Sequence, residues 1–361
     1  MKYNYQLLKN QFITLLCLVA LSFSCKTETE DFVCTPCDLD CDTLIFSEAG
    51  TCPHCNMALI KKADLEKMNQ TIISGDLQIN YEFLDEESLA KEAEFTKVIT
   101  KTFAFYKDLF GGNPRDTLDA TYTDFTIKVS KTKDSGGEAN PKSIVFNWSD
   151  NTTLGYGTWK TVLMHELFHL WNGETIRYKN GEEHWFNEGF SEFYTFKTAV
   201  EMDVVSPEEM LTTSALSLGY YTGSKGLGNI SMRDAGINDK LKFENFFLVY
   251  HGGWITAMVL DVDIRSKTNN EKSLDDLMKW LYTNFLRTEK LYDTNDIING
   301  IKITTGLNYT EFSNNYIYNS EEIPVSNYFD PGKALWDFKW NRESKSNHKY
   351  LYKTLGINIK N

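Results

Sequence analysis

The chain has 361 residues, of which 42% are hydrophobic and 14% aromatic, and its formal net charge is −13. This length and hydrophobic content are enough to bury the core of one large domain or two smaller ones. The acidic balance disfavours nucleic acids and anionic lipid surfaces as partners, since both would repel the chain. The sequence has no basic stripe and no internal repeat, so we expect a globular protein that binds no nucleic acid.

The N-terminus has the pattern of an export signal. Two lysines precede the apolar stretch 12–23, which is too short to cross a bilayer comfortably and fits a secretory signal. Cys25 follows directly, in a pattern that resembles the bacterial lipoprotein signal in which this cysteine is lipidated. We therefore expect a lipoprotein signal peptide at 1–24, a flexible acidic tether at 25–31, and an exported protein anchored in the outer membrane through Cys25. Ordinary secretion is the alternative.

Five of the seven cysteines lie within residues 34–55. Four of them form two C-x-x-C pairs that fourteen residues separate, and the fifth, Cys41, lies between the pairs. This spacing is close to that of four-thiolate zinc sites. The candidate ligands are Cys34, Cys37, Cys52 and Cys55, with Cys41 and His54 as spare candidates. Disulfides are the alternative, since an exported chain permits them. Residues 51–59 resemble the signature of small heavy-metal-binding domains, so 32–61 is expected to form a Cys-rich module holding a second Zn²⁺ or another metal.

The next part of the chain is expected to mix helices and strands. Residues 62–79 are mixed and polar, and we expect a linker there. Apolar residues recur at helical spacing across 85–110, and a Gly-Gly-Asn-Pro run ends the predicted helix. The stretches 122–130 and 143–148 alternate as strands do, and 131–140 between them reads as a glycine-containing turn.

The remainder is expected to be nearly all helical, which together with the preceding part predicts an α+β fold. The predicted helices cover residues 159–171, 184–200, 246–265, 273–286, 294–306 and 309–318. One large domain is expected at 80–338, followed by a short C-terminal tail at 339–361.

Two of these helices carry the residues of a metal site. His165 and His169 frame Glu166 in an H-E-x-x-H motif, which puts both imidazoles on one face of a helix, one turn apart. Glu188, nineteen positions after His169, is the expected third ligand and leaves the open position that a catalytic Zn²⁺ needs. Glu166 is then expected to activate zinc-bound water. Glu192, one turn after Glu188, is expected to fix the tautomer of a ligand histidine, and a solvated helix charge is the alternative.

Such a site between a mixed α/β lobe and a mostly helical lobe predicts a thermolysin-like zinc metallopeptidase. Hydrolysis also needs a hydrogen-bond donor for the oxyanion that develops on the scissile carbonyl. Tyr250 and His251 are the two candidates, and composition does not choose between them because the chain has nineteen tyrosines. His184 is read as a loop residue ahead of its helix.

Residues 83–338 resemble the glycyl aminopeptidase family of gluzincin zinc metallopeptidases. The resemblance rests on H-E-L-F-H-L-W-N at 165–172, W-F-N-E-G-F at 185–190 and S-L-D-D at 273–276. It implies peptide-bond hydrolysis of a peptide or protein substrate and assigns the oxyanion-stabilising role to Tyr250. Gly252 departs from the family, which has Lys there. The segment 135–140 only approximates the family's G-G-x-E-H, so aminopeptidase and endopeptidase action both stay open.

A second hypothesis is a catalytically inactive metal-binding or scaffold lipoprotein that keeps the peptidase fold. It is motivated by the altered segment 135–140 and by the Cys-rich module. The sequence carries no signal for an oligomeric state.

Overall fold

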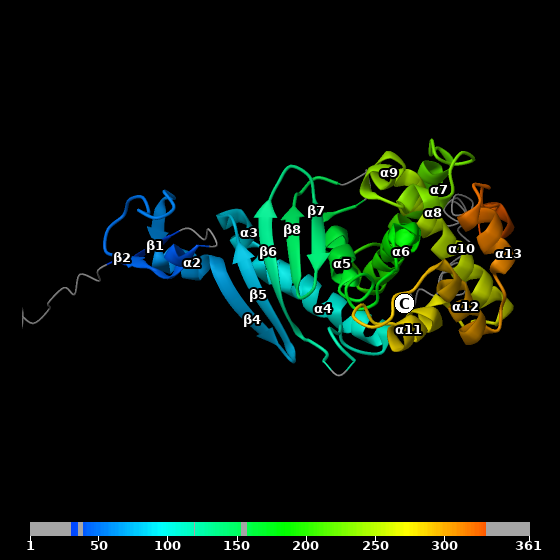
Figure 1. The fold of residues 1–361 in the computed structure, drawn as a ribbon, viewed down its shortest axis with the longest axis horizontal. Coiled ribbons are helices and arrows are strands. Elements are labelled where there is room, and N and C mark those ends of the chain that lie inside the picture. Colours follow the sequence, from blue (N-terminus) through cyan, green and yellow to red (C-terminus); the bar gives the residue numbers. More distant parts are fainter. Residues whose placement is uncertain (1–29, 35–38, 119, 153–156, 330–361) are drawn as a thin grey trace, which may run out of the picture. The chain divides into compact units, whose positions relative to one another are not determined.

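The computed structural model of the chain describes residues 30–34, 39–118, 120–152 and 157–329 (Figure 1). The predicted signal peptide at 1–24, Cys25, Cys37 and the predicted tail at 339–361 lie outside the described residues. The chain divides into two compact units, Met1–Lys67 and Met68–Asn361.

The first unit is a small sheet around cysteine side chains. Strand β1 (Phe32–Cys34) pairs antiparallel with β2 (Ile45–Phe46) on one side and with β3 (Leu59–Lys61) on the other. The 3₁₀ turn η1 (Asp40–Thr43) lies between β1 and β2, and α2 (Lys62–Met68) follows β3. Its buried apolar cluster consists of Cys34, Cys41 and Cys52, with Phe46, Cys55 and Leu59 packed against them. A core of this size does not stabilise a fold by apolar burial alone.

The second unit begins with a five-stranded mixed sheet in the order β4-β5-β6-β8-β7 (Figure 1). The central strands β5 (Leu77–Phe83), β6 (Asp124–Lys131) and β8 (Ser143–Trp148) are parallel. The edge strands β4 (Asn69–Ser74) and β7 (Gly136–Asn140) pair antiparallel with β5 and β8. Alternate residues of the central strands are buried, as the two-residue period of a strand requires.

Both edge strands differ from the sequence expectation. Residues 62–79, expected to be a linker, form α2, β4 and the start of β5, and the turn expected at 131–140 contains β7. The reason is physical: β4 and β7 expose most of their side chains, so neither shows an alternating apolar pattern. Their backbones are held by pairing with a central strand, which single-sequence patterns do not record.

Helix α4 (Glu92–Phe110) packs its apolar stripe on the buried face of the sheet. Phe95, for example, meets Phe146 of β8 edge-on, with the ring centroids 5.9 Å apart. The single helix expected at 85–110 is two helices, because α3 (Glu86–Ala90) ends before Lys91 and α4 begins after it.

The rest of the second unit is helical (Figure 1). Its α-helices are α5 (Trp159–His169), α6 (His184–Glu201), α7 (Pro207–Thr222), α8 (Met232–Gly236), α9 (Asp239–Glu244), α10 (Gly252–Lys267), α11 (Leu274–Asn284), α12 (Thr294–Thr305) and α13 (Thr310–Ser313). Single 3₁₀ turns lie at Gly181–Glu183 (η2) and Val325–Asn327 (η5), and π-helical turns at Phe247–His251 (η3) and Asn314–Tyr318 (η4). The predicted α+β fold is confirmed.

Helices α7, α8 and α9 were not predicted. Pro207 reads as a helix breaker, but it occupies the first turn of α7, where its missing N–H costs nothing. Ser206 caps this helix by accepting a hydrogen bond from the Glu209 amide, and Glu209 accepts one in return from the Ser206 amide.

Two glycines let α6 and α10 cross in close contact. A Cβ on Gly189 of α6 would lie 2.3 Å from the Cα of Gly253, and a Cβ on Gly253 would lie 1.9 Å from the carbonyl oxygen of Trp185. Both clashes are with backbone, so neither position accepts a side chain without moving a helix. The crossing sets Glu188 on α6 beside Tyr250, which precedes α10.

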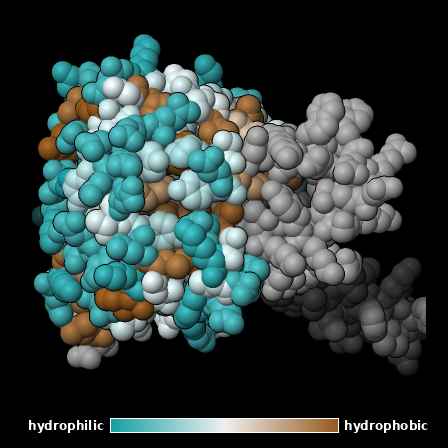
Figure 2. Space-filling model, turned by 90° about the vertical axis from the view of Figure 1, so that its right-hand side faces the viewer, coloured by the Kyte–Doolittle hydropathy of each residue, from teal (hydrophilic) through white to brown (hydrophobic). Residues whose placement is uncertain are grey.

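The segment Phe247–Lys267 is the one stretch of the described chain that is long and apolar enough to span a membrane, and 83% of its apolar window is buried inside the protein. It is the central helix of the second unit's core. On the face of the molecule shown in Figure 2, hydrophilic residues dominate and hydrophobic residues form small, separate patches.

Candidate active site

Helices α5 and α6 bring the three expected metal ligands together. Nε2 of His165 lies 2.9 Å from Nε2 of His169, and Oε2 of Glu188 lies 3.5 Å from each of these nitrogens. All three residues are buried or nearly so. A tetrahedral Zn²⁺ with bonds of about 2.1 Å holds its donor atoms roughly 3.4 Å apart. The donor set and its spacing therefore fit zinc.

The far side of each imidazole faces a polar group. Nδ1 of His169 lies 2.9 Å from the carbonyl oxygen of Asn172, a hydrogen bond that turns Nε2 toward the other donor atoms. Nδ1 of His165 lies 3.4 Å from Oε1 of Glu192 but makes no hydrogen bond within the described residues. Glu192 is thus the carboxylate next to this ring.

Glu166 lies on α5 between the two histidines and borders a cavity of about 670 Å³. Burial raises the pKa of its carboxyl above the ordinary value, and the neighbouring His165 and His169 oppose that rise. Glu166 is not part of the group of possible metal ligands formed by His165, His169 and Glu188. Its carboxylate therefore remains available for proton transfer.

Of the two oxyanion candidates, Tyr250 is the one that faces the cavity. Burial, followed by the charges of Glu188 and Glu166, raises the pKa of its phenol well above the usual value, so the group stays a hydrogen-bond donor. His251 turns to Ser217, whose Oγ lies 3.0 Å from its Nδ1, and burial lowers its pKa to about 4. Composition and spacing do not distinguish these neighbours, and the family resemblance alone indicates Tyr250; in the structure, the π-helical turn η3 places Tyr250 at the cavity.

Lys242 is a site residue that the sequence did not indicate. It lies on α9 and borders the cavity, and its Nζ is 3.7 Å from Oε1 of Glu188. Its side chain is only 12% exposed. The ammonium holds one oxygen of Glu188 while the other faces the histidines. Because α9 was not predicted, no signal in the sequence placed this lysine near the metal ligands.

The sequence gives two readings of His184: it begins the predicted helix at 184–200, and its context suggests a loop residue ahead of that helix. The structure agrees with the helix, because His184 is the buried first residue of α6. Its Nδ1 lies 2.7 Å from the carbonyl oxygen of Gly236, and its Nε2 lies 3.0 Å from the hydroxyl of Tyr178. These contacts stabilise the first turn of α6, the helix that carries Glu188.

The edge strand β7 borders the cavity next to Glu166. A Cβ on Gly137 would lie 2.6 Å from Cγ of Glu166, so this face of the strand is directed at Glu166. Glu138 is paired with Val145, an exposed residue of β8. Glu138 borders the cavity as well, but neighbouring strand residues point to opposite faces, so strand alternation directs its side chain away from the face that Gly137 turns to Glu166.

A model of the "Peptidase family M1 domain" matches residues 138–221, the stretch that contains both histidines, Glu166 and Glu188. This stretch carries the M1 metallopeptidase pattern. The predicted resemblance to gluzincin zinc metallopeptidases is thereby confirmed over residues 138–221.

Two solved structures share the fold. An aminopeptidase N family protein from Idiomarina loihiensis aligns with a TM-score of 0.62 at 17% identity, over 72% of this chain and 48% of its own. A variant of an M1 zinc metallopeptidase from Deinococcus radiodurans aligns with a TM-score of 0.50 at 12% identity, over 71% of this chain and 52% of its own. The chain thus spans about half the length of these relatives.

In the first unit, Cys34, Cys41, Cys52 and Cys55 form a second group of possible metal ligands. None of these four is in a disulfide. Cys41, expected as a spare, is part of the group, whereas Cys37 lies outside the described residues.

Proposed function

We propose that the protein hydrolyses peptide bonds with one catalytic Zn²⁺ held by His165, His169 and Glu188. The observation that carries the proposal is the convergence of these three donors within 4.8 Å of one another, in a cavity that Glu166 and Tyr250 also line. When bound, Zn²⁺ would act as a Lewis acid toward the scissile carbonyl and acidify the attacking water.

The protein's own residues supply the remaining chemistry. Glu166 accepts a proton from the attacking water and returns it to the leaving amine, and a carboxyl with a raised pKa is suited to both transfers. Tyr250 donates a hydrogen bond to the oxyanion from a phenol that stays protonated. Lys242 and Glu192 keep Glu188 and His165 in position.

Replacing Glu166 by Gln tests this proposal. The variant should retain zinc, because Glu166 is not a ligand, and should lose turnover by about 10³-fold or more if the carboxylate moves the protons. Equal activity of Glu166→Gln and the unmodified protein would contradict the assignment. An inactive scaffold, the second hypothesis, would show no cleavage by the unmodified protein across a broad peptide library while still holding zinc.

We further propose that cleavage does not require a free substrate N-terminus. Recognition of an α-ammonium needs an unengaged carboxylate in the cavity, and strand alternation directs Glu138 to the opposite sheet face. The other cavity carboxylates, apart from Glu166, already face a cation or a histidine: Glu174 faces Arg177 and Arg287, Glu188 faces Lys242, Glu192 faces His165, and Asp239 faces Lys242.

Matched pairs of peptides, free and N-acetylated, test this second proposal. The kcat/KM values of each pair should agree within about threefold, and Glu138→Gln should leave both unchanged, because no interaction with the amine is lost. A preference of 100-fold for the free amine that disappears in Glu138→Gln would show that this carboxylate does bind the N-terminus. The fold likeness to an aminopeptidase does not decide the matter.

We also propose that the protein is exported and acts at the outer membrane, where a lipid on Cys25 anchors it. The apolar stretch followed by this cysteine supports it. Mass spectrometry of the mature N-terminal peptide should find a lipid on Cys25, and Cys25→Ser should release the protein from the membrane fraction. Detection of an unmodified N-terminus at another residue would favour ordinary secretion.

The first unit is proposed to hold a second metal ion, supported by its four neighbouring thiols.

A further inference from the structure

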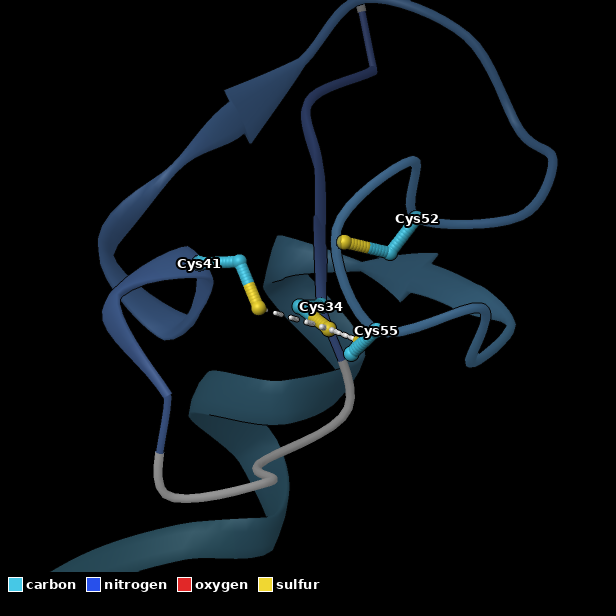
Figure 3. A group of neighbouring side chains, drawn as sticks. All are labelled: Cys34, Cys41, Cys52 and Cys55. Atoms are coloured by element: carbon cyan, nitrogen blue, oxygen red, sulfur yellow. Dashed lines mark hydrogen bonds between the residues drawn. The ribbon is translucent and has the colours of Figure 1, made fainter.

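The four thiols of the first unit are not used by the proposed hydrolysis (Figure 3). Their Sγ atoms all lie within 4.8 Å of one another. The closest pair is Cys34 and Cys55 at 3.1 Å, and Cys41 lies 4.0 Å from Cys34. In Figure 3 the side chains come from β1, from η1 and from the loop before β3, and they point toward a common centre.

The distances match a metal site better than disulfides. Sulfurs bound to one tetrahedral Zn²⁺ at about 2.3 Å are roughly 3.8 Å apart. The observed separations, from 3.1 Å to at most 4.8 Å, bracket that value. A disulfide needs about 2.05 Å between its sulfurs, and none of the four cysteines forms one.

The backbone around Cys52 and Cys55 is shaped to present two sulfurs to one point. The Asn56 amide donates to the Cys52 carbonyl at 2.9 Å, and the Cys52 amide donates to the Met57 carbonyl at 2.8 Å. Asn56 has a φ of 60°, a left-handed conformation that asparagine tolerates better than most residues. The tight turn places the two thiols on the same side.

The other two thiols come from β1 and η1. Cys34 ends β1, where it pairs with Leu59 of β3, and Cys41 lies seven residues later on η1 with 3% of its surface exposed. Spacing in the sequence favours Cys37 as the partner of Cys34, because C-x-x-C pairs are the common arrangement. Among the described residues, the fourth sulfur comes from Cys41, and Cys37 lies outside them.

The first unit also needs such a site for stability. Among the described residues, the buried hydrophobic residues of the first unit are Val33 and three of the four thiols, and the thiols form its buried cluster. Thiols alone give little apolar burial, while a bound ion links β1, η1 and the loop before β3 at one point. Loading releases the four thiol protons to solvent, and no oxidant or reductant is required.

We propose that Cys34, Cys41, Cys52 and Cys55 form a closed, structural Zn²⁺ site that holds the first unit folded. Once these four thiolates are bound, a tetrahedral ion has no position left for Cys37. The four thiolates fill all tetrahedral positions, which leaves no place for water or substrate, so the ion takes no part in hydrolysis. The proposal does not rest on the peptidase function, because the two sites share no residue.

Cobalt substitution of the full chain tests the ligand set. Co²⁺ bound to thiolates gives a near-ultraviolet charge-transfer band, and the candidate active site, with nitrogen and oxygen donors only, does not contribute to it. Cys41→Ser should lower this band by about a quarter and weaken Co²⁺ binding by at least 10-fold, whereas Cys37→Ser should leave both within twofold. The reverse result, or an unchanged band in Cys41→Ser, would overturn the proposal.

Alkylation of the unmodified, zinc-loaded protein gives a second measurement that does not depend on a variant folding. Mass spectrometry should find Cys37 modified and the four ligand thiols protected until a chelator is added. Modification of Cys41 with protection of Cys37, or a disulfide between any of the four, would refute the site. Peptide hydrolysis by Cys41→Ser should stay within twofold of the unmodified protein per catalytic zinc, and its loss would contradict the purely structural role.

Discussion

Replacing Gly137 by Ala tests whether the edge strand and the general base are packed as the structure has them. The added methyl would lie 2.6 Å from Cγ and 2.9 Å from Cδ of Glu166. Ordinary contact begins near 3.4 Å, so the Glu166 side chain must retreat by about 0.8 Å or leave its rotamer. The Val145 carbonyl, also 2.9 Å from the methyl, prevents the strand from absorbing the whole shift.

A displacement of this size at a catalytic group costs about 10²-fold in rate, or about 2.7 kcal/mol of transition-state stabilisation. We therefore expect Gly137→Ala to lower kcat/KM roughly 100-fold while the catalytic site keeps its zinc, since none of the three ligands is touched. Peptide turnover, zinc per chain and the melting temperature should be measured together, so that lost activity is not confused with unfolding.

Gly136 provides the matched control on the same strand. A Cβ added there meets nothing within 4 Å, so Gly136→Ala should retain activity within about twofold. If Gly137→Ala is as active as Gly136→Ala, then Glu166 does not lie against β7 during catalysis and the reasoning is wrong.

Three further predictions follow from named contacts. Tyr250→Phe should lower kcat by about 10²- to 10³-fold with little change in KM or zinc content, as measured by peptide kinetics; an unchanged kcat would remove Tyr250 from the mechanism. Lys242→Met should weaken zinc binding by about 10- to 100-fold in a chelator competition, with recovery in Lys242→Arg, because the ammonium holds Glu188; equal affinities would show the contact to be incidental. Burial raises the pKa of Glu183 to about 7, against the hydrogen bonds from Thr294 that lower it. The pKa of Glu183 is thus higher in the folded than in the unfolded state. The stability that Glu183 contributes is therefore fully present below about pH 4.5, and up to about 3 kcal/mol of it is lost as the pH rises through 7. Denaturant unfolding of Glu183→Gln should show a smaller loss of stability over this range than the unmodified protein, and parallel curves would contradict the shift.

The metal ligands of the second unit were predictable because their geometry is local. Helical periodicity alone puts His165 and His169 on one face, and an acidic residue on a following helix completed the set. Even the supporting position of Glu192 follows from one further helical turn. These predictions needed no knowledge of how distant elements pack.

The residues that the sequence did not place depend on packing between distant elements. Lys242 reaches Glu188 only because the short helix α9 lies beside the cavity. The preference for Tyr250 over His251 came from the family resemblance, and its structural reason is the π-helical turn that places Tyr250 at the cavity. Cys41 lies 4.0 Å from Cys34, although no C-x-x-C spacing relates the two residues. The edge strands β4 and β7 could not be predicted, because their conformation depends on backbone pairing with a central strand and not on a pattern of apolar side chains.

The most direct test of the account is an anomalous difference map at the zinc absorption edge from crystals of the full chain. We predict a peak about 2.0–2.2 Å from Nε2 of His165, Nε2 of His169 and a carboxylate oxygen of Glu188, with its fourth side open to the cavity that Tyr250 borders. A map with no peak there, or with the carboxylate of Glu166 occupying the fourth position, would contradict a catalytic zinc at this site.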